Sequence, residues 1–213
     1  MASSLTFPVT APTTPAPSES RWFLRQYTAS VQNDFDLSRN IASAPAARWE
    51  SAFRLPSTTR DQLSNWLGFL AGLRGSYGSF YWGPSVAGDP SGAMASDGGS
   101  PLIKDAGAAL AVGDTVLTVD GFTAGAVTGF AKTGDWFEVD DYLYRLTEDS
   151  NKNASGEVTF TFQPPLKTAP ADNAPVTVTS PKGVFRLKMN SMPQIGFNGS
   201  HVGQSVTLAI EEI

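Results

Sequence analysis

The clearest periodic segment of the sequence covers residues 47–55, where apolar and charged side chains alternate. The apolar positions are Trp49, Phe53 and Leu55, and the charged positions are Arg48, Glu50 and Arg54. A period of two is typical of a strand with one buried face, because successive side chains point to opposite faces of a sheet. Pro56 then ends the run. We therefore predict a half-buried antiparallel strand here.

A helical pattern follows this strand directly. Thr58 and Asp61 have the spacing of a capping box, with Asp in place of the usual Glu. Apolar residues then recur at helical spacing, at Leu63, Trp66, Leu67, Leu70 and Leu73. Gly72 and Gly75 are candidate C-terminal caps, because glycine readily adopts the left-handed conformation that ends many helices. The pattern predicts one α-helix over residues 58–74.

Shorter alternating or aromatic runs predict further strands. They cover residues 21–31, 77–82, 115–119, 157–163, 176–179, 183–189 and 205–213. Residues 135–146 are expected to form two strands that break near Asp140. Residues 5–9 alternate and predict a short edge strand within a proline-rich arm. Residues 33–40 are predicted to form a turn region, and residues 150–156 a polar loop.

The composition of the chain changes at Pro84. Residues 84–101 consist largely of Gly, Pro, Ser, Asp and Ala, which marks a long loop or a boundary. We predict a mainly β fold with one flanking α-helix. One main β domain is assigned to residues 1–86 and 183–213. A linker and an inserted small all-β domain are assigned to residues 87–182.

Composition adds an expectation about partners. Of the 213 residues, 16% are charged and 11% are aromatic. An ordinary soluble domain carries about 25% charged residues. This chain therefore has either a large core or apolar surface that other subunits cover. We predict extensive subunit contacts, and the alternative is an unusually apolar monomer. The net charge of −5 and the scattered basic residues disfavour a static nucleic-acid binder.

The chain has no cysteine, which excludes disulfides, zinc knuckles and a thiol nucleophile. No secretion signal is predicted, because a basic region followed by an apolar one is missing from the N-terminal segment. No apolar run is long enough to span a bilayer. We therefore expect a soluble protein, made in the cytoplasm, with no membrane insertion.

Candidates for catalysis are weak. His201 is the only histidine, and in its Gly- and Ser-containing loop it is predicted to be a turn residue. No serine lies in a Gly-x-Ser-x-Gly elbow. Asp135, Glu138 and Asp140 lie near one another and are candidates for a glycosidase pair, whereas Asp141 points to the opposite face. We favour a solvated strand face and turn for these carboxylates.

Candidates for ligand binding are equally weak. Residues 149–153 begin like a calcium loop, but the glycine and the final glutamate of that motif are missing. No Gly-rich phosphate loop is present. Trp49 and Trp66 lie on apolar faces and are predicted to be core residues, and the role of Trp82 stays open. The sequence predicts no catalytic, cofactor-binding or metal-binding residues, no cofactor and no enzyme.

Several segments together are similar to tail-tip proteins of long-tailed bacteriophages. In addition to the helix, they are residues 49–56, 75–83, 113–115, 134–136, 156–166, 185–187 and 206–212. The chain resembles the distal tail proteins of siphophages over most of residues 20–213. The resemblance implies a tail-tube-like β-sandwich in a ring, usually of six copies. It also implies a location in the virion, at the tail tip, and no catalytic residues.

The same resemblance implies partners. The ring would join the tail tube protein to the baseplate hub and other tail-tip proteins. Genomic DNA would pass through its lumen without specific binding, and acidic residues there would keep the DNA mobile.

Alternatives remain open. A carbohydrate-binding adhesin would carry a platform for host glycan on residues 102–182, with Trp136 and Tyr142 exposed. A glycan-degrading enzyme would use Asp135 or Glu138. Another tail tube or minor tail component is a further alternative.

Overall fold

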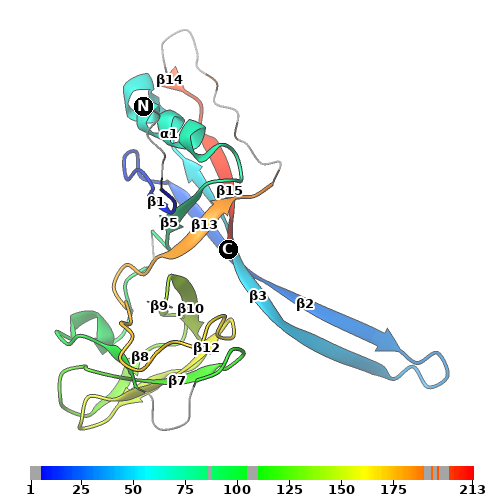
Figure 1. Ribbon diagram of the computed structural model, residues 1–213, viewed down its shortest axis with the longest axis vertical. Helices are drawn as coiled ribbons and strands as arrows, with labels where there is room; N and C mark the ends of the chain where they lie inside the picture. The colour runs from blue at the N-terminus through cyan, green and yellow to red at the C-terminus, as the bar shows by residue number, and fades with distance from the viewer. Residues whose placement is uncertain (1–5, 86–87, 105–109, 190–192, 194–195, 197–201) are drawn as a thin grey trace.

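The described chain is mainly β, with one α-helix and two multi-stranded sheets (Figure 1). The structure is a computed structural model that describes residues 6–85, 88–104, 110–189, 193, 196 and 202–213. The predicted fold class, a mainly β protein with one helix, is confirmed. Within the described residues, no helix combines the length and the apolar character that a bilayer crossing needs.

The first sheet has six strands in the order β1-β5-β13-β15-β3-β2. Their bounds are Val9–Thr10 (β1), Ser79–Trp82 (β5), Gly183–Leu187 (β13), Val206–Glu212 (β15), Arg39–Leu55 (β3) and Glu19–Gln32 (β2). Neighbouring strands are antiparallel, except that β1 runs parallel to β5 at one edge. The sheet therefore joins strands from both ends of the chain, and β2 forms its other edge.

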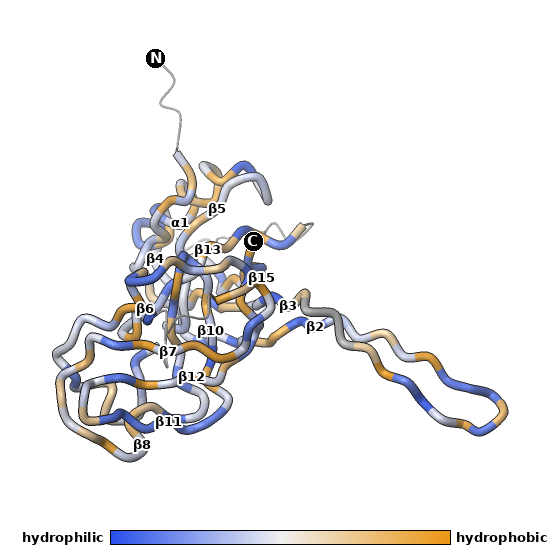
Figure 2. Tube along the Cα trace, turned by 60° about the horizontal axis from the view of Figure 1, so that its bottom comes forward, coloured by the Kyte–Doolittle hydropathy of each residue, from blue (hydrophilic) through white to orange (hydrophobic). Residues whose placement is uncertain are grey.

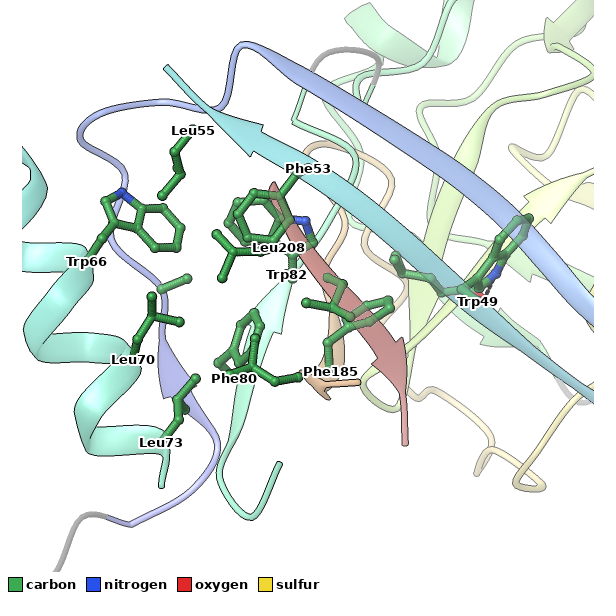
Figure 3. Close-up of a cluster of buried hydrophobic side chains, with 14 of the residues drawn as sticks. Trp49, Phe53, Leu55, Trp66, Leu70, Leu73, Phe80, Trp82, Phe185 and Leu208 are labelled. Atoms are coloured by element: carbon green, nitrogen blue, oxygen red, sulfur yellow. Dashed lines mark hydrogen bonds between the residues drawn. The ribbon is translucent and has the colours of Figure 1, made fainter. Parts of the chain in front are cut away.

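Helix α1 (Arg60–Leu73) packs its apolar stripe against one face of this sheet (Figure 3). The buried helix residues are Leu63, Trp66, Leu70 and Leu73. Trp66 contacts Phe53 and Trp82, with ring centroids 5.7 and 6.1 Å apart, and its indole N–H donates to the carbonyl of Pro15 at 3.2 Å. Burial of one such large apolar side chain contributes about 1.5–3 kcal/mol. The core prediction for Trp66 is confirmed.

Both ends of the helix differ from the prediction. The N-cap is Thr59 and its side chain makes no capping hydrogen bond, while the Thr58 hydroxyl bonds instead to the side chain of Gln62. The predicted capping box is therefore wrong. The C-cap is Arg74, in the left-handed region at φ 53°, and Gly75 follows at φ 73°. Gly75 thus lies one residue beyond the cap, and Gly72 lies inside the helix.

The second sheet has seven strands, five of them in the order β6-β7-β12-β10-β9. Strand β11 pairs with both β12 and β8. The bounds are Leu102–Lys104 (β6), Val116–Asp120 (β7), Val127–Ala131 (β8), Trp136–Val139 (β9), Tyr142–Leu146 (β10), Ser150–Lys152 (β11) and Val158–Gln163 (β12). A 3-10 turn, η1 (Ala93–Ser96), precedes it, and β14 (Val202–Gly203) pairs with β4 (Thr58–Thr59) in a separate two-stranded sheet.

Several strand predictions are confirmed in the second sheet, and others are wrong. Residues 135–146 do form two strands, which break at Asp140 and Asp141, both at positive φ. Residues 176–179 form no strand and make only an isolated bridge from Thr177 to Glu138. The predicted polar loop at 150–156 begins with β11, because alternate residues Ser150 and Lys152 are buried there.

The largest difference from the prediction is the length of β3. This strand begins at Arg39, within the predicted turn region, and pairs with β2 as far as Gln32. Residues 39–46 were missed because they are mostly small or polar and show no apolar alternation. The outer part of the β2–β3 hairpin projects away from the other strands of the first sheet and from the second sheet (Figure 1).

Candidate assembly surface

The outer part of the β2–β3 hairpin lies outside both hydrophobic cores of the described residues. We call residues 27–46 the distal hairpin. Every residue of β2 from Arg25 onward is exposed. Exposed large apolar side chains gather along this hairpin and its inner edge, namely Phe23, Tyr27, Val31, Phe35, Leu37 and Ile41. Figure 2 shows apolar and polar residues interspersed along the projecting ribbon. A two-stranded ribbon is at best marginally stable in water, so this exposed apolar segment is a candidate interaction surface.

A break in pairing separates the distal hairpin from the sheet. Gln26 pairs with Ala47, but the next pair is Thr28 with Ser43. Tyr27 alone therefore faces the three residues 44–46. Pro45 lies within this interval and has no N–H to donate to the ladder. Such an irregularity bends a strand and increases its twist, and it marks the place where the ribbon leaves the sheet.

The hairpin tip is a hydrogen-bonded turn. The N–H of Asn33 donates to the carbonyl of Ser38 at 2.9 Å, and the Asn33 side chain accepts from the N–H of Phe35 at 3.0 Å. Asp36 accepts from both the N–H and the hydroxyl of Ser38, and these bonds lower the pKa of its carboxyl group. Phe35 is 100% exposed at the apex. The hydrogen-bonded turn therefore presents a fully exposed aromatic side chain at the end of the hairpin.

Buried carboxylates lie where the hairpin joins the sheet. Glu50 is 1% exposed and binds Arg25, Arg48 and Lys188 at 3.2, 3.6 and 2.6 Å. Burial alone raises its pKa, but the hydrogen bonds from Lys188 and Arg25 outweigh this effect and hold the pKa below its ordinary value. Glu50 therefore stays ionised, and it holds the first half of the hairpin against the sheet.

Two further glutamates extend this network. Glu211 pairs across the sheet with Glu50 and binds Arg48 at 2.8 Å and Arg186 at 3.0 Å. Glu212, on the other face, binds Lys167 at 2.7 Å and accepts from the backbone N–H groups of Trp49 and Leu143. We call this group of residues the base cluster, and it consists of Glu50, Glu211, Glu212, Arg25, Arg48, Lys167, Arg186 and Lys188. Five cations face three carboxylates, which leaves an excess of two positive charges.

A groove of about 480 Å³ lies beside the base cluster. The hairpin contributes Tyr27 and residues 46–48 to its wall, and the segments beside the second sheet contribute residues 112–113 and 165–167. We call it the base groove. Its lining is mostly apolar, with Arg48 and Lys167 as its two cations. The base groove thus has an apolar wall and lies next to the cations of the base cluster.

The second sheet contacts the first through Trp136. This residue is 5% exposed, and its ring lies 4.5 Å from that of Trp49 and 5.4 Å from that of Trp22. It belongs to the core of the first sheet, together with Leu143 of β10. The core prediction for Trp49 is confirmed. The buried position of Trp136 counts against its use as a sugar platform, and Lys167 covers the ring of Tyr142 at 4.8 Å.

Trp82, whose role the sequence left open, is a core residue. It is 7% exposed and stacks on Phe53, with ring centroids 4.2 Å apart (Figure 3). Its indole nitrogen is buried without a hydrogen-bond partner. It also lines a second groove of about 450 Å³, between the arm around residues 10–13 and 16–17 and the segments 83–85, 88–89 and 180–182.

The carboxylates singled out in the sequence serve turns and loops. Asp135 is buried and accepts from the N–H and hydroxyl of Ser91 and from the N–H of Lys132. Glu138 accepts from the N–H of Asp141 at 3.0 Å. The carboxylate of Asp135 is therefore already hydrogen-bonded to backbone and hydroxyl donors, and the carboxylate of Glu138 closes the turn at Asp141. Asp140 lies 3.5 Å from the hydroxyl of Thr168.

The segment that begins like a calcium loop uses its oxygens within the protein. Asp149 binds Lys132 at 2.8 Å and accepts from Thr133, which lowers its pKa to about 2. Asn151 accepts from the N–H of Gly129, and Asn153 from two N–H groups of its own loop. No group of three metal-binding side chains occurs in the described part of the chain. His201 lies outside the described residues.

No sequence pattern predicted the distal hairpin as a surface. Its one local sign is the apolar residue Phe35 between two aspartates, within a segment predicted to turn.

Compared with known proteins, the chain matches no protein-family profile and no curated protein sequence.

Proposed function

We propose that the chain is a structural virion protein that forms an oligomeric ring at the distal end of a phage tail. The ring would join the tail tube to the baseplate hub and the host-recognition proteins. The observation that carries the proposal is the distal hairpin. It has two unpaired backbone edges and exposed apolar side chains, and both need a neighbour. Neighbouring copies around a ring would cover them.

The low content of charged residues supports the same proposal. Only 16% of residues are charged, and a ring subunit is covered on several sides. Among the described residues, the carboxylates proposed for glycan cleavage are bound to backbone or hydroxyl donors. The resemblance of the sequence to distal tail proteins also favours a structural role over an enzyme.

The charge distribution of the chain bears on whether the lumen of such a ring would bind DNA. In our proposal, genomic DNA passes through the lumen without specific binding. The net charge of −5 supports an acidic lumen that does not hold phosphates. The base cluster has an excess of positive charge, which would attract phosphates. The proposal therefore places the base cluster away from the DNA path.

Mass photometry and negative-stain electron microscopy of the purified full chain test the proposal. We expect assemblies of several copies with a central hole. We also expect the fraction of the chain in these assemblies to grow with protein concentration. A variant in which Asn-Gly replaces residues 27–46 should stay monomeric, because it joins the cross-strand partners Gln26 and Ala47 through a favoured two-residue turn. The matched control is Tyr77→Ser, which alters another exposed aromatic residue, outside the hairpin.

Two results would overturn the proposal. The first is a monomer at every concentration with the hairpin intact. The second is a ring that forms equally well without residues 27–46.

A further inference from the structure

The hairpin tip and the base groove have complementary chemistry. The tip segment, residues 33–38, carries Asp34 and Asp36 on either side of the fully exposed Phe35, and no cation. The base groove has an apolar wall, with Arg48 and Lys167 among its lining residues. The tip thus presents one aromatic ring between two negative charges. The groove presents an apolar surface beside an excess of two positive charges.

The size of the groove suits the side chain at the tip. A phenylalanine side chain buries about 150–250 Å² when it is covered. A groove of about 480 Å³ is large enough for one such ring and for part of the turn that carries it. Hydrogen bonds from Asn33 and Asp36 already fix the turn, so docking would order little additional chain.

A tip cannot reach the groove of its own copy. Tyr27 lines the groove, and Phe35 lies eight positions further along an extended strand and turn. At about 3.3 Å per residue, these positions separate the tip from the groove by roughly 20–25 Å. The occupant must therefore come from another copy of the chain.

We propose that the hairpin tip of one copy docks in the base groove of the next copy. Phe35 enters the apolar part of the groove, while Asp34 and Asp36 face the base cluster. Each copy gives its tip to one neighbour and receives a tip from another. Such a head-to-tail contact closes into a ring when the rotation between copies allows it. This inference rests on the proposed ring and names the contact that builds it.

A photocrosslinker at the apex tests the contact directly. Phe35→p-benzoylphenylalanine keeps an aromatic ring at the tip, and the full exposure of Phe35 means that the fold has no contact to lose. After irradiation of the assembled full chain, mass spectrometry should find tip peptides joined to peptides that carry Val112 or Leu166. A mixture of light- and heavy-isotope copies shows whether each crosslink joins two molecules. Tyr77→p-benzoylphenylalanine is the matched control and should not label these peptides.

The concentration dependence of assembly provides a second test of the contact. Phe35→Ala should raise the concentration at which assembly is half complete by about tenfold or more, as truncation of a buried aromatic anchor does. Asp34→Asn with Asp36→Asn should also weaken assembly, and the effect should shrink at high salt.

The outcomes separate this inference from the proposed function. Intermolecular crosslinks to the groove peptides support both. Assemblies that form normally but crosslink elsewhere overturn the tip-in-groove contact and leave the ring proposal standing. A chain that stays monomeric before irradiation overturns the ring proposal, and the contact falls with it.

Discussion

Asp97, at the end of η1, and Lys152, in β11 of the second sheet, form a buried ion pair, and its loss should destabilise the protein measurably. Both side chains are 5% exposed, and Lys152 Nζ lies 2.5 Å from Asp97 Oδ2. Asp97 also accepts from the N–H groups of Gly99 and Thr123. In Asp97→Asn, the amide can keep the backbone bonds, but the buried ammonium of Lys152 loses its counter-charge. We expect a loss of about 3–5 kcal/mol at pH 7.

The pH dependence gives an independent magnitude. Burial raises the pKa of Asp97, but the hydrogen bonds from Lys152, Thr123 and Gly99 prevail and lower it from 3.8 to about 2. A carboxyl group whose pKa is lower in the folded state stabilises the fold above its unfolded pKa. This contribution, about 2.5 kcal/mol, is lost as the pH falls from about 5 to about 1. The wild-type chain should therefore lose that much more stability than Asp97→Asn over this range.

Urea unfolding at a series of pH values, followed by circular dichroism and tryptophan fluorescence, measures both quantities. The double variant Asp97→Asn with Lys152→Met is the control, because it removes the ammonium together with its partner. It should recover much of the stability lost in the single variant. The reasoning fails if Asp97→Asn changes stability by less than about 0.5 kcal/mol at pH 7. It also fails if the two chains lose stability in parallel on acidification.

Four further outcomes follow from the packing or exposure of single residues, each measured by urea unfolding. Trp136→Ala should cost about 3–5 kcal/mol, because it opens a cavity between the two sheets; a loss below 1 kcal/mol would contradict that position. Gly156→Ala should destabilise by more than 1 kcal/mol, since φ is +83° and a Cβ would lie 2.2 Å from the carbonyl of Phe122. Gly68→Ala, within the helix and facing open space, should instead stabilise by about 0.5–1 kcal/mol. Phe35→Ser should leave monomer stability within about 0.5 kcal/mol.

The elements that sequence reasoning located are those in which burial leaves a periodic trace. Trp49 and Phe53 alternate with charged residues because one face of β3 covers the core. Trp66 and Leu70 fall on one stripe of the helix because that stripe packs on the sheet. In each case one face of the element is buried and the other is exposed to solvent, so the hydrophobic pattern has the period of the element.

Other features leave no such trace. Residues 39–46, apart from Ile41, are small or polar, and the described side chains among them, residues 39–42 and 46, are exposed. The helix is capped by Arg74, a non-glycine residue in the left-handed region at φ 53°, although Gly75 follows directly, and no sequence pattern predicts this choice. The pairing of Asp97 with Lys152 joins residues 55 positions apart, a separation that no local pattern encodes.

The uneven burial along β2 and β3 is itself an argument about assembly. The first half of the hairpin is tied to the sheet by the Glu50 and Glu211 ion pairs and by Trp49. Beyond the break at Tyr27, the chain keeps strand pairing but has no core beneath it. A monomer would gain little from extending a ribbon that buries nothing, since ordering each residue costs about 1–2 kcal/mol. If a partner covers the extension, as we propose, the extension becomes favourable, and the fixed turn around Phe35 is the end that such a partner would meet first.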